Sequence, residues 1–174
     1  MEERITSRKN PLVQQVRKLL ASRKAREETG LFVSDGTKLL KEAAAYWKGL
    51  HTVFLSDGVE ADVPERVRVI RVSREVMEAI SPMETPQGAV FLCRLPEKTP
   101  FVPEKGMLLL DGIQDPGNVG TILRTADAWN VPVALLEGCA DPFSHKVVRA
   151  SMGAVFRRPV VVTTWQQAFD ACTR

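Results

Sequence analysis

Apolar and polar residues follow two distinct patterns along the chain. Short runs of aliphatic and β-branched residues, bounded by glycine, proline or serine, are typical of strands. These runs predict strands at residues 30–36, 51–56, 67–72, 88–95, 107–113, 131–138 and 158–163. Apolar residues at helical spacing predict helices at residues 11–28, 37–49, 73–81, 119–129, 144–156 and 164–174. Because strands and helices alternate, the predicted fold class is α/β.

A stretch of prolines and charged residues divides this pattern into two parts. Its composition suits neither a helix nor a central strand, so we predict a linker at residues 96–105. Residues 1–95 are predicted to form a small α/β domain with a sheet between helices. Residues 106–174 are predicted to form three parallel strands with crossover helices, which is half of a doubly wound domain.

The bulk composition is that of a globular protein. The chain has 174 residues, of which 44% are hydrophobic and 26% charged. No apolar run approaches the roughly 18 residues that a membrane helix requires. Residues 1–15 lack the apolar core of a signal peptide. We therefore expect a cytoplasmic protein that does not contact a membrane.

The cysteines and histidines give no sign of a metal site or a disulfide. Cys93, Cys139 and Cys172 are odd in number and far apart, so we expect them to be small buried apolar residues. His51 and His145 have no partners at metal-ligand spacing.

Basic residues are concentrated near the N-terminus, although the net charge is only +3. Residues 4–26 contain no Asp or Glu and eight basic residues: Arg4, Arg8, Lys9, Arg17, Lys18, Arg23, Lys24 and Arg26. Such a block is usually a solvated helix face. Without acidic residues inside the block to form i,i+4 pairs, it suits a phosphate-binding surface equally well.

The stretch LLLDGIQDPGNVGTILRTADAWN, residues 108–130, places an unusual arginine on a helix. Arg124 falls opposite the apolar stripe of the predicted helix, and Gly120, one turn earlier on the same face, would leave room for a ligand. Asn118 is a suitable N-cap, and a helix N-terminus favours anions. Either the stretch binds an anionic substrate, or it is a capped helix in which Arg124 pairs with Asp127. The residues of the predicted apolar stripe are Val119, Ile122, Leu123, Ala126 and Trp129.

A nucleotide-binding metabolic enzyme is a third possibility that the glycines do not favour. The spacing of Gly112, Gly117 and Gly120 matches no dinucleotide-binding fingerprint, and no P-loop lysine follows. Glu137 lies close to the spacing of a ribose-binding acid, but it lacks the accompanying glycine motif.

The segment DGIQDPGNVGTILRTADA, residues 111–128, closely resembles the first signature motif of the SpoU/TrmH family of RNA 2′-O-methyltransferases in the SPOUT class. SHKVVRASMGAVFRRPV is similar to the segment that follows in this family. ITSRKNPLVQQVRKLL, GLFVSDGTKLLKEA and METPQGAVF resemble its N-terminal substrate-binding domain, whose RNA-binding fold is related to certain ribosomal proteins. The usual Glu-Gly of that domain is Asp35-Gly36 here.

The resemblance implies an enzyme that methylates ribose with S-adenosylmethionine as the donor, and its ribosomal members imply ribosomal RNA as the substrate. Arg124 would act on the 2′-hydroxyl and bind the adjacent phosphate, and Asn118 would hold the loop and contact Arg124 or the RNA. The eight basic residues of the N-terminal block and Arg149 would bind the RNA. Lys146, Arg157 and Arg158 are expected to be solvated surface.

The later motifs of the family are not in this sequence. A Gly-x-Glu type loop and a Ser-Leu-Asn type segment would form a trefoil knot, the S-adenosylmethionine pocket and much of a homodimer interface, but the sequence stops at Arg174. We therefore expect the donor-binding residues mainly outside it. An incomplete copy of the enzyme is favoured over a short RNA-binding protein without catalysis, because a half-built parallel sheet exposes a strand edge and apolar surface.

Overall fold

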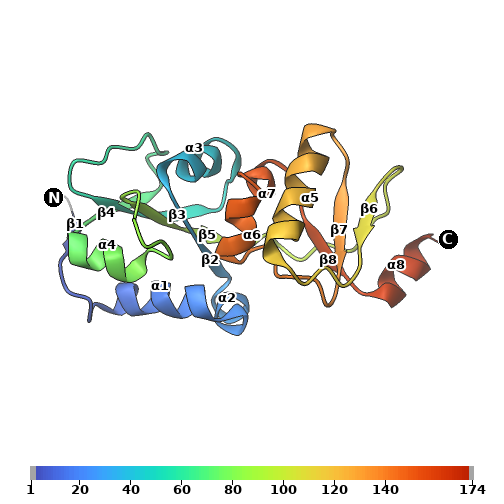
Figure 1. The fold of residues 1–174 in the computed structure, drawn as a ribbon, viewed down its shortest axis with the longest axis horizontal. Coiled ribbons are helices and arrows are strands. Elements are labelled where there is room, and N and C mark those ends of the chain that lie inside the picture. Colours follow the sequence, from blue (N-terminus) through green and yellow to red (C-terminus); the bar gives the residue numbers. More distant parts are fainter. Residues whose placement is uncertain (1–2, 173–174) are drawn as a thin grey trace. The chain divides into compact units, whose positions relative to one another are not determined.

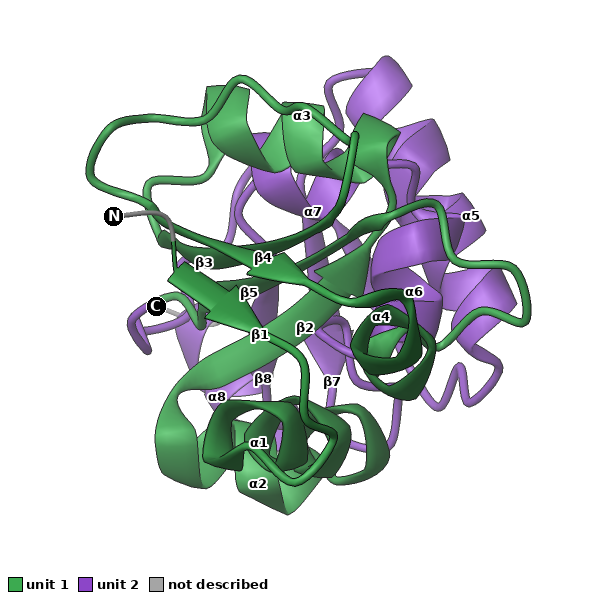
Figure 2. Ribbon diagram, turned by 90° about the vertical axis from the view of Figure 1, so that its left-hand side faces the viewer, with its two compact units in different colours: residues 1–96 green, residues 97–174 purple. Residues whose placement is uncertain are grey.

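A computed structural model describes residues 3–172 of the chain. The chain divides into two compact units, Met1–Pro96 and Glu97–Arg174, coloured separately in Figure 2. Residues 1–2 of the predicted N-terminal domain and residues 173–174 of the predicted last helix lie outside the described part.

Unit 1 contains a five-stranded mixed sheet with the order β1-β4-β3-β5-β2. Strand β3 pairs with β4 in parallel and with β5 antiparallel, β1 joins β4 in parallel, and β2 joins β5 antiparallel. The strands are β1 (Glu3–Ile5), β2 (Leu31–Asp35), β3 (Leu50–Ser56), β4 (Arg68–Val72) and β5 (Ala89–Arg94).

Helices cover both faces of this sheet, which confirms the predicted layering. Apolar residues of α1 and α4 share one core cluster with Val33, Phe54 and Ile70 of the sheet, and α3 lies on the opposite face (Figure 2). Because side chains alternate along a strand, neighbouring residues such as Phe54 and Leu55 are both buried, on opposite faces. The helices are α1 (Pro11–Ala21), α2 (Arg23–Thr29), α3 (Thr37–Tyr46) and α4 (Arg74–Ile80).

The long helix predicted over residues 11–28 is wrong, because it is two helices that meet at Ser22. Ser22 has extended backbone angles, φ −135° and ψ 119°, and its hydroxyl accepts a hydrogen bond from the Ala25 backbone N–H. Serine competes for backbone donors in this way and therefore begins helices better than it continues them. Strand β1 was not predicted, because three residues carry too little pattern.

Unit 2 contains three parallel strands, as predicted, and the structure shows that their order is β6-β7-β8 (Figure 1). The central strand β7 is buried along its whole length, which its continuous apolar run indicates. The strands are β6 (Leu108–Leu110), β7 (Val133–Leu136) and β8 (Val161–Thr163), and the helices are α5 (Pro116–Ala128), α6 (His145–Ala150), α7 (Ala154–Arg157) and α8 (Trp165–Cys172).

Several large apolar side chains of unit 2 are exposed. Trp129 was expected in the apolar stripe of α5, but it is the C-cap and is 78% exposed, so this prediction is wrong. The cap has left helical geometry, and helical spacing no longer determines the direction of its side chain. The other exposed apolar residues of this unit are Val102, Leu108, Leu109, Met152, Val162, Trp165 and Phe169.

The cysteines differ in burial, so the expectation that all are buried is wrong for two of them. Cys93 is buried in β5, and this burial raises the pKa of its thiol well above the usual value. Cys139 is half-buried and Cys172 is exposed. Over residues 3–172, no helix combines the length and the apolar character needed to cross a membrane.

Candidate active site

Helix α5 of unit 2 begins earlier than predicted, with Asp115 rather than Asn118 as its N-cap. The Asp115 side chain accepts a hydrogen bond from the Asn118 backbone N–H at 2.7 Å, and Pro116 occupies the first helical position. Both Asp and Asn can cap a helix, but the fixed φ of proline favours the first turn and so selects the residue before it. The Asn118 side chain is exposed, and within the described residues it forms no hydrogen bond.

Arg124 lies in the middle of α5 and is exposed, as predicted. Val119, Leu123 and Ala126 form the buried face of this helix. In the part of the chain that the structure describes, the Arg124 guanidinium has no hydrogen bond or ion pair, so it is not bonded to Asn118 either. A cation held on a rigid helix with its five donors open can bind an anionic oxygen.

Gly120 does not leave room for a ligand beside Arg124, contrary to the prediction. It is buried, and a Cβ built on it would lie 2.4 Å from the Ala150 Cβ and 2.8 Å from the Ser151 backbone nitrogen. The glycine therefore allows α5 to pack closely against the end of α6. This contact joins segments that are distant in sequence, which helical periodicity cannot reveal.

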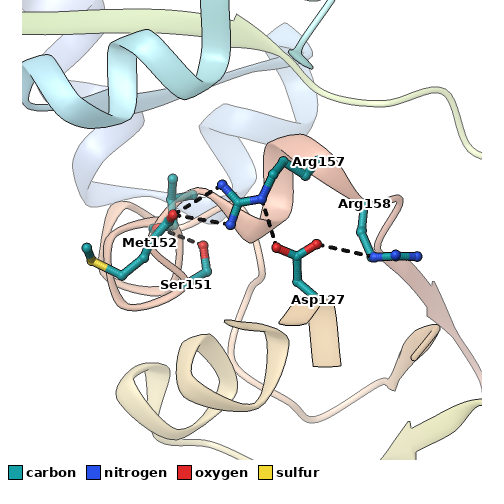
Figure 3. Close-up of polar contacts among 6 residues, drawn as sticks. Asp127, Ser151, Met152, Arg157 and Arg158 are labelled. Atoms are coloured by element: carbon teal, nitrogen blue, oxygen red, sulfur yellow. Dashed lines mark hydrogen bonds and ion pairs between the residues drawn. The ribbon is translucent and has the colours of Figure 1, made fainter. Parts of the chain in front are cut away.

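The carboxylate of Asp127 binds two arginines rather than Arg124 (Figure 3). Its Oδ2 accepts a hydrogen bond from Arg157 Nε at 2.8 Å, and its Oδ1 accepts one from Arg158 Nε at 3.2 Å. The prediction that Arg157 and Arg158 are solvated surface is therefore wrong. An isolated acid in the last turn of a helix and two adjacent arginines before Pro159 were signals for this cluster, but no local rule connects residues so far apart in the sequence.

The other basic residues of unit 2 lie on α6. Lys146 is exposed and Arg149 is half-buried in the last turn of the helix. The C-terminal end of a helix favours a cation, so Arg149 also has a structural role there.

Most of the N-terminal basic block is bound by acidic or carbonyl groups of unit 1. Arg4 makes two hydrogen bonds to Asp57 at 2.9 and 2.7 Å, and Arg8 donates to the Glu75 carbonyl at 3.1 Å. Residues 4–26 contain no acid that could form i,i+4 pairs, but two such pairs form with acids just beyond the block, at Arg23–Glu27 (2.8 Å) and Lys24–Glu28 (3.8 Å).

Arg26 is not part of a surface at all. It is only 6% exposed, and its Nη1 donates a hydrogen bond to the Leu19 carbonyl at 2.6 Å. This bond joins α2 to α1 across the break at Ser22. The prediction that Arg26 binds RNA is therefore wrong, because the break between the helices turns its side chain inward.

Three members of the block remain open: Lys9, Arg17 and Lys18. All are exposed, and within residues 3–172 none has a hydrogen bond or ion pair from its side chain. The apolar face of α1, which includes Val13 and Val16, is buried in the core, so the cations of this helix project to the opposite side. This set is the part of the block that can bind phosphates.

His51 and the Glu3–Arg68 pair of unit 1 also have shifted pKa values. Burial, and secondarily the charges of Arg94 and Arg68, lower the pKa of His51 below its usual 6.5. The hydrogen bond from Arg68 lowers the pKa of Glu3.

Within the described residues no metal site can be assigned, and the hollow beside α5 is too small to be a donor pocket. No group of three or more His, Cys, Asp or Glu side chains there could hold a metal ion. A hollow beside α5, lined by Leu123, Ala126 and Arg158 among others, has a cavity volume of about 10 Å³. This volume accommodates about one water and does not fit S-adenosylmethionine.

Comparison with known proteins places both units in one group of enzymes. The SpoU rRNA Methylase family matches residues 105–174, and the MRM3-like substrate binding domain matches residues 10–90. The chain is 33% identical over 162 residues to the 23S rRNA (guanosine(2553)-2′-O)-methyltransferase RlmP of Bacillus subtilis, covering 91% of this chain and 64% of that protein. It is 36% identical over 156 residues to the mitochondrial rRNA methyltransferase 3 of Xenopus laevis, covering 82% of this chain and 37% of that protein.

Solved structures show the same relationship. An AdoMet-bound rRNA methyltransferase from Sinorhizobium meliloti superposes with a TM-score of 0.84 at 29% identity, covering 98% of this chain and 69% of that one. A TrmH-family protein from Porphyromonas gingivalis, described as a candidate RNA methyltransferase, has a TM-score of 0.78 at 36% identity, covering 87% of this chain and 61% of that one.

The chain spans less than two thirds of the length of the curated relatives described here. Its two matched regions nevertheless occur in the order expected from the sequence, with the substrate-binding domain before the SpoU domain. The chain therefore belongs to the SpoU family of RNA methyltransferases.

Proposed function

We propose that the protein containing this chain methylates a ribose 2′-oxygen of ribosomal RNA, with S-adenosylmethionine as the methyl donor. The observation that carries the proposal is Arg124, an exposed arginine without a partner among the described residues, held on the helix that carries the family motif. The relatives named as rRNA methyltransferases and the AdoMet-bound structure support the substrate and the donor.

Arg124 binds the phosphate next to the target ribose in this proposal. A planar guanidinium can donate two parallel hydrogen bonds to phosphate oxygens, which fixes the orientation of the sugar as well as its position. Such positioning supplies much of the rate enhancement of a group transfer.

The same guanidinium stabilises the negative charge that develops on the 2′-oxygen as it loses its proton. Arginine remains protonated in proteins, so its cationic form is better suited to this electrostatic role than to accepting the proton. The exposed Asn118 side chain contacts the RNA from the first turn of α5, while the Asp115 cap holds the loop.

Residues 1–95 act as the substrate-binding domain, residues 96–105 as a linker and residues 106–174 as part of the catalytic domain. Lys9, Arg17 and Lys18 contact the RNA backbone, since their charges are open, and Arg149 contributes from α6. Recognition of folded RNA depends mostly on its shape and on backbone contacts.

We infer a homodimer in the cytoplasm for the complete protein. The exposed apolar residues Leu108, Leu109 and Val162 on β6 and β8 support an assembly that covers them. S-adenosylmethionine supplies the methyl group when bound, and its site is proposed to lie largely in further chain or in a second subunit, because the hollow beside α5 does not fit it.

Transfer of a labelled methyl group to ribosomal RNA that lacks ribose methylation, followed by mapping of the methylated nucleotide, tests the proposal. Arg124→Lys retains the charge but loses the planar fork, so we expect kcat to fall about 100-fold or more. Arg66→Lys is the matched control, because Arg66 is another exposed arginine without a partner among the described residues.

Near-normal turnover by Arg124→Lys would overturn the proposed role of Arg124. Tight RNA binding without any methyl transfer to any ribosomal RNA would instead indicate an RNA-binding protein without catalysis.

A further inference from the structure

Arg124 and Asp127 lie three residues apart on α5, at a spacing where an acid and a base can pair. Residues at i and i+3 are neighbours on a helix surface, and opposite charges there attract. Arg124 nevertheless has no ion pair within the described residues. The absence of an ion pair between Arg124 and Asp127 therefore requires an explanation.

The explanation lies in the other partners of Asp127. Each of its carboxylate oxygens accepts a hydrogen bond from a different arginine, Oδ2 from Arg157 at 2.8 Å and Oδ1 from Arg158 at 3.2 Å. The side chains of Asp127, Arg157 and Arg158 are 16%, 27% and 35% exposed. A half-buried carboxylate that has two cationic donors has little to gain from a third, more exposed one.

Arg157 is itself held in place by a second contact. Both terminal nitrogens of Arg157 lie 3.5 Å from the Met152 carbonyl oxygen, and Arg158 extends from the other side of the carboxylate (Figure 3). Met152 has a positive φ of 51°, so its carbonyl direction depends on an unusual backbone conformation. The turn after α6 and the end of α7 therefore fix how Asp127 is bound.

We propose that Arg157 and Arg158 are positioning residues that hold the Asp127 carboxylate away from Arg124 and so keep the Arg124 guanidinium open to an anionic substrate oxygen. This inference rests on the proposed function of Arg124. Without the two arginines, the half-buried carboxylate would have an uncompensated charge, and Arg124 is the cation at helical spacing that can compensate it. The enzyme would then inhibit itself by an internal ion pair.

A purely structural role makes a different prediction. If the cluster only joined α5 to α7, removing the acid or removing both arginines would break the same contact with the same effect. If the arginines protect Arg124, removing them is harmful only while Asp127 keeps its charge. Asp127→Asn should therefore rescue the double variant Arg157→Gln/Arg158→Gln.

The test measures how fast phenylglyoxal modifies Arg124, by peptide mass spectrometry, in the full chain without RNA or donor. An ion pair stabilises the charged guanidinium and hinders its modification. We expect modification of Arg124 to be about threefold slower in the double variant than in the wild type. Asp127→Asn alone, and the triple variant, should match the wild type. Arg17 serves as the internal reference, because it is exposed and has no partner in the described region.

Local unfolding would speed the modification of Arg124 rather than slow it, so loss of structure cannot imitate the expected result. If the double variant does not fold, Arg158→Gln alone frees one carboxylate oxygen and should give a smaller slowing that Asp127→Asn reverses. An unchanged rate in the folded variants, or a triple variant as slow as the double, would overturn the inference.

The same substitutions are assayed for methyl transfer in the complete protein that contains this chain. A parallel fall and rescue of kcat, with little change in KM for RNA, supports the inference. If Arg124 shows the expected protection and rescue while no variant or wild type transfers methyl groups, the positioning inference is supported and the proposed function fails.

Discussion

Gly120 of α5 faces Ala150 of α6 with no space for a side chain between them. A Cβ on Gly120 would lie 2.4 Å from the Ala150 Cβ, far inside a normal contact, and the nearby atoms include backbone that cannot move aside cheaply. The glycine therefore determines how closely the two helices approach. Because α5 carries Arg124, this contact also positions the candidate active site.

We expect Gly120→Ala to destabilise the protein by about 1–3 kcal/mol, the usual cost of overpacking a core. The sign of this change in stability is informative, because Gly→Ala at an exposed position inside a helix stabilises the helix by about 1 kcal/mol. Urea unfolding measures the change. Thr121→Ala, at the next position on the exposed side of α5, is the control and should stay within about 0.5 kcal/mol of the wild type. A more stable Gly120→Ala variant would show that the helices do not pack as described.

Substitutions of Arg26 and Arg17 should have different effects, the first on the stability of the fold and the second on RNA binding. Arg26→Met leaves the Leu19 carbonyl without its buried donor, so we expect a loss of about 1–3 kcal/mol in the free energy of unfolding. Arg17→Met should leave stability nearly unchanged and weaken RNA binding, because Arg17 is exposed and open. Urea unfolding and RNA titration on both variants check this. Equal effects of the two substitutions on RNA affinity would contradict the assignment.

The open cations of the N-terminal block should control the salt dependence of RNA binding. Each phosphate contact contributes about 0.7–0.9 to the slope of log K against log salt, so replacing Lys9, Arg17 and Lys18 by Gln should reduce the slope by about two to three. Replacing Arg4, Arg23 and Lys24 by Gln is the matched control, because acidic groups already pair with these cations. A larger reduction of the salt slope in the control variant would show that the paired cations are the ones that bind RNA.

His51 should make the stability depend on pH below neutrality. Its pKa in the folded protein lies below the usual 6.5, so the unfolded chain takes up the proton first as the pH falls. Stability is therefore expected to decrease from about pH 6.5 down to the folded pKa and then to level off. High salt should reduce the part of the effect that arises from the charges of Arg94 and Arg68, but not the part that arises from burial.

Two measurements check this prediction. The His51 imidazole should titrate by NMR with a midpoint below 6.5, and His51→Gln should remove the decrease in urea stability over this pH range. A midpoint at or above 6.5 would show that neither burial nor the two arginines disfavour its charged form.

The sequence by itself determined the alternation of strands and helices, the parallel pairing expected in unit 2 and the exposure of Arg124. These features depend on local periodicity, which a single segment carries. The N-cap at Asp115 could also have been predicted from the sequence, because Pro116 immediately follows it. The family motif added the chemistry that periodicity does not contain.

Only the tertiary structure decided which residues lie against one another. The contacts of three residues could not be read from the sequence. Gly120 packs against Ala150 and not a ligand, and Arg26 binds the Leu19 carbonyl and not RNA. Asp127 pairs with Arg157 and not with Arg124. The Asp127–Arg157 pair joins residues 30 positions apart, and the same side chains would suit either arrangement. Local spacing along the sequence limits which residues can be partners. The packing of helices and the burial of charge then determine which of these partners form contacts.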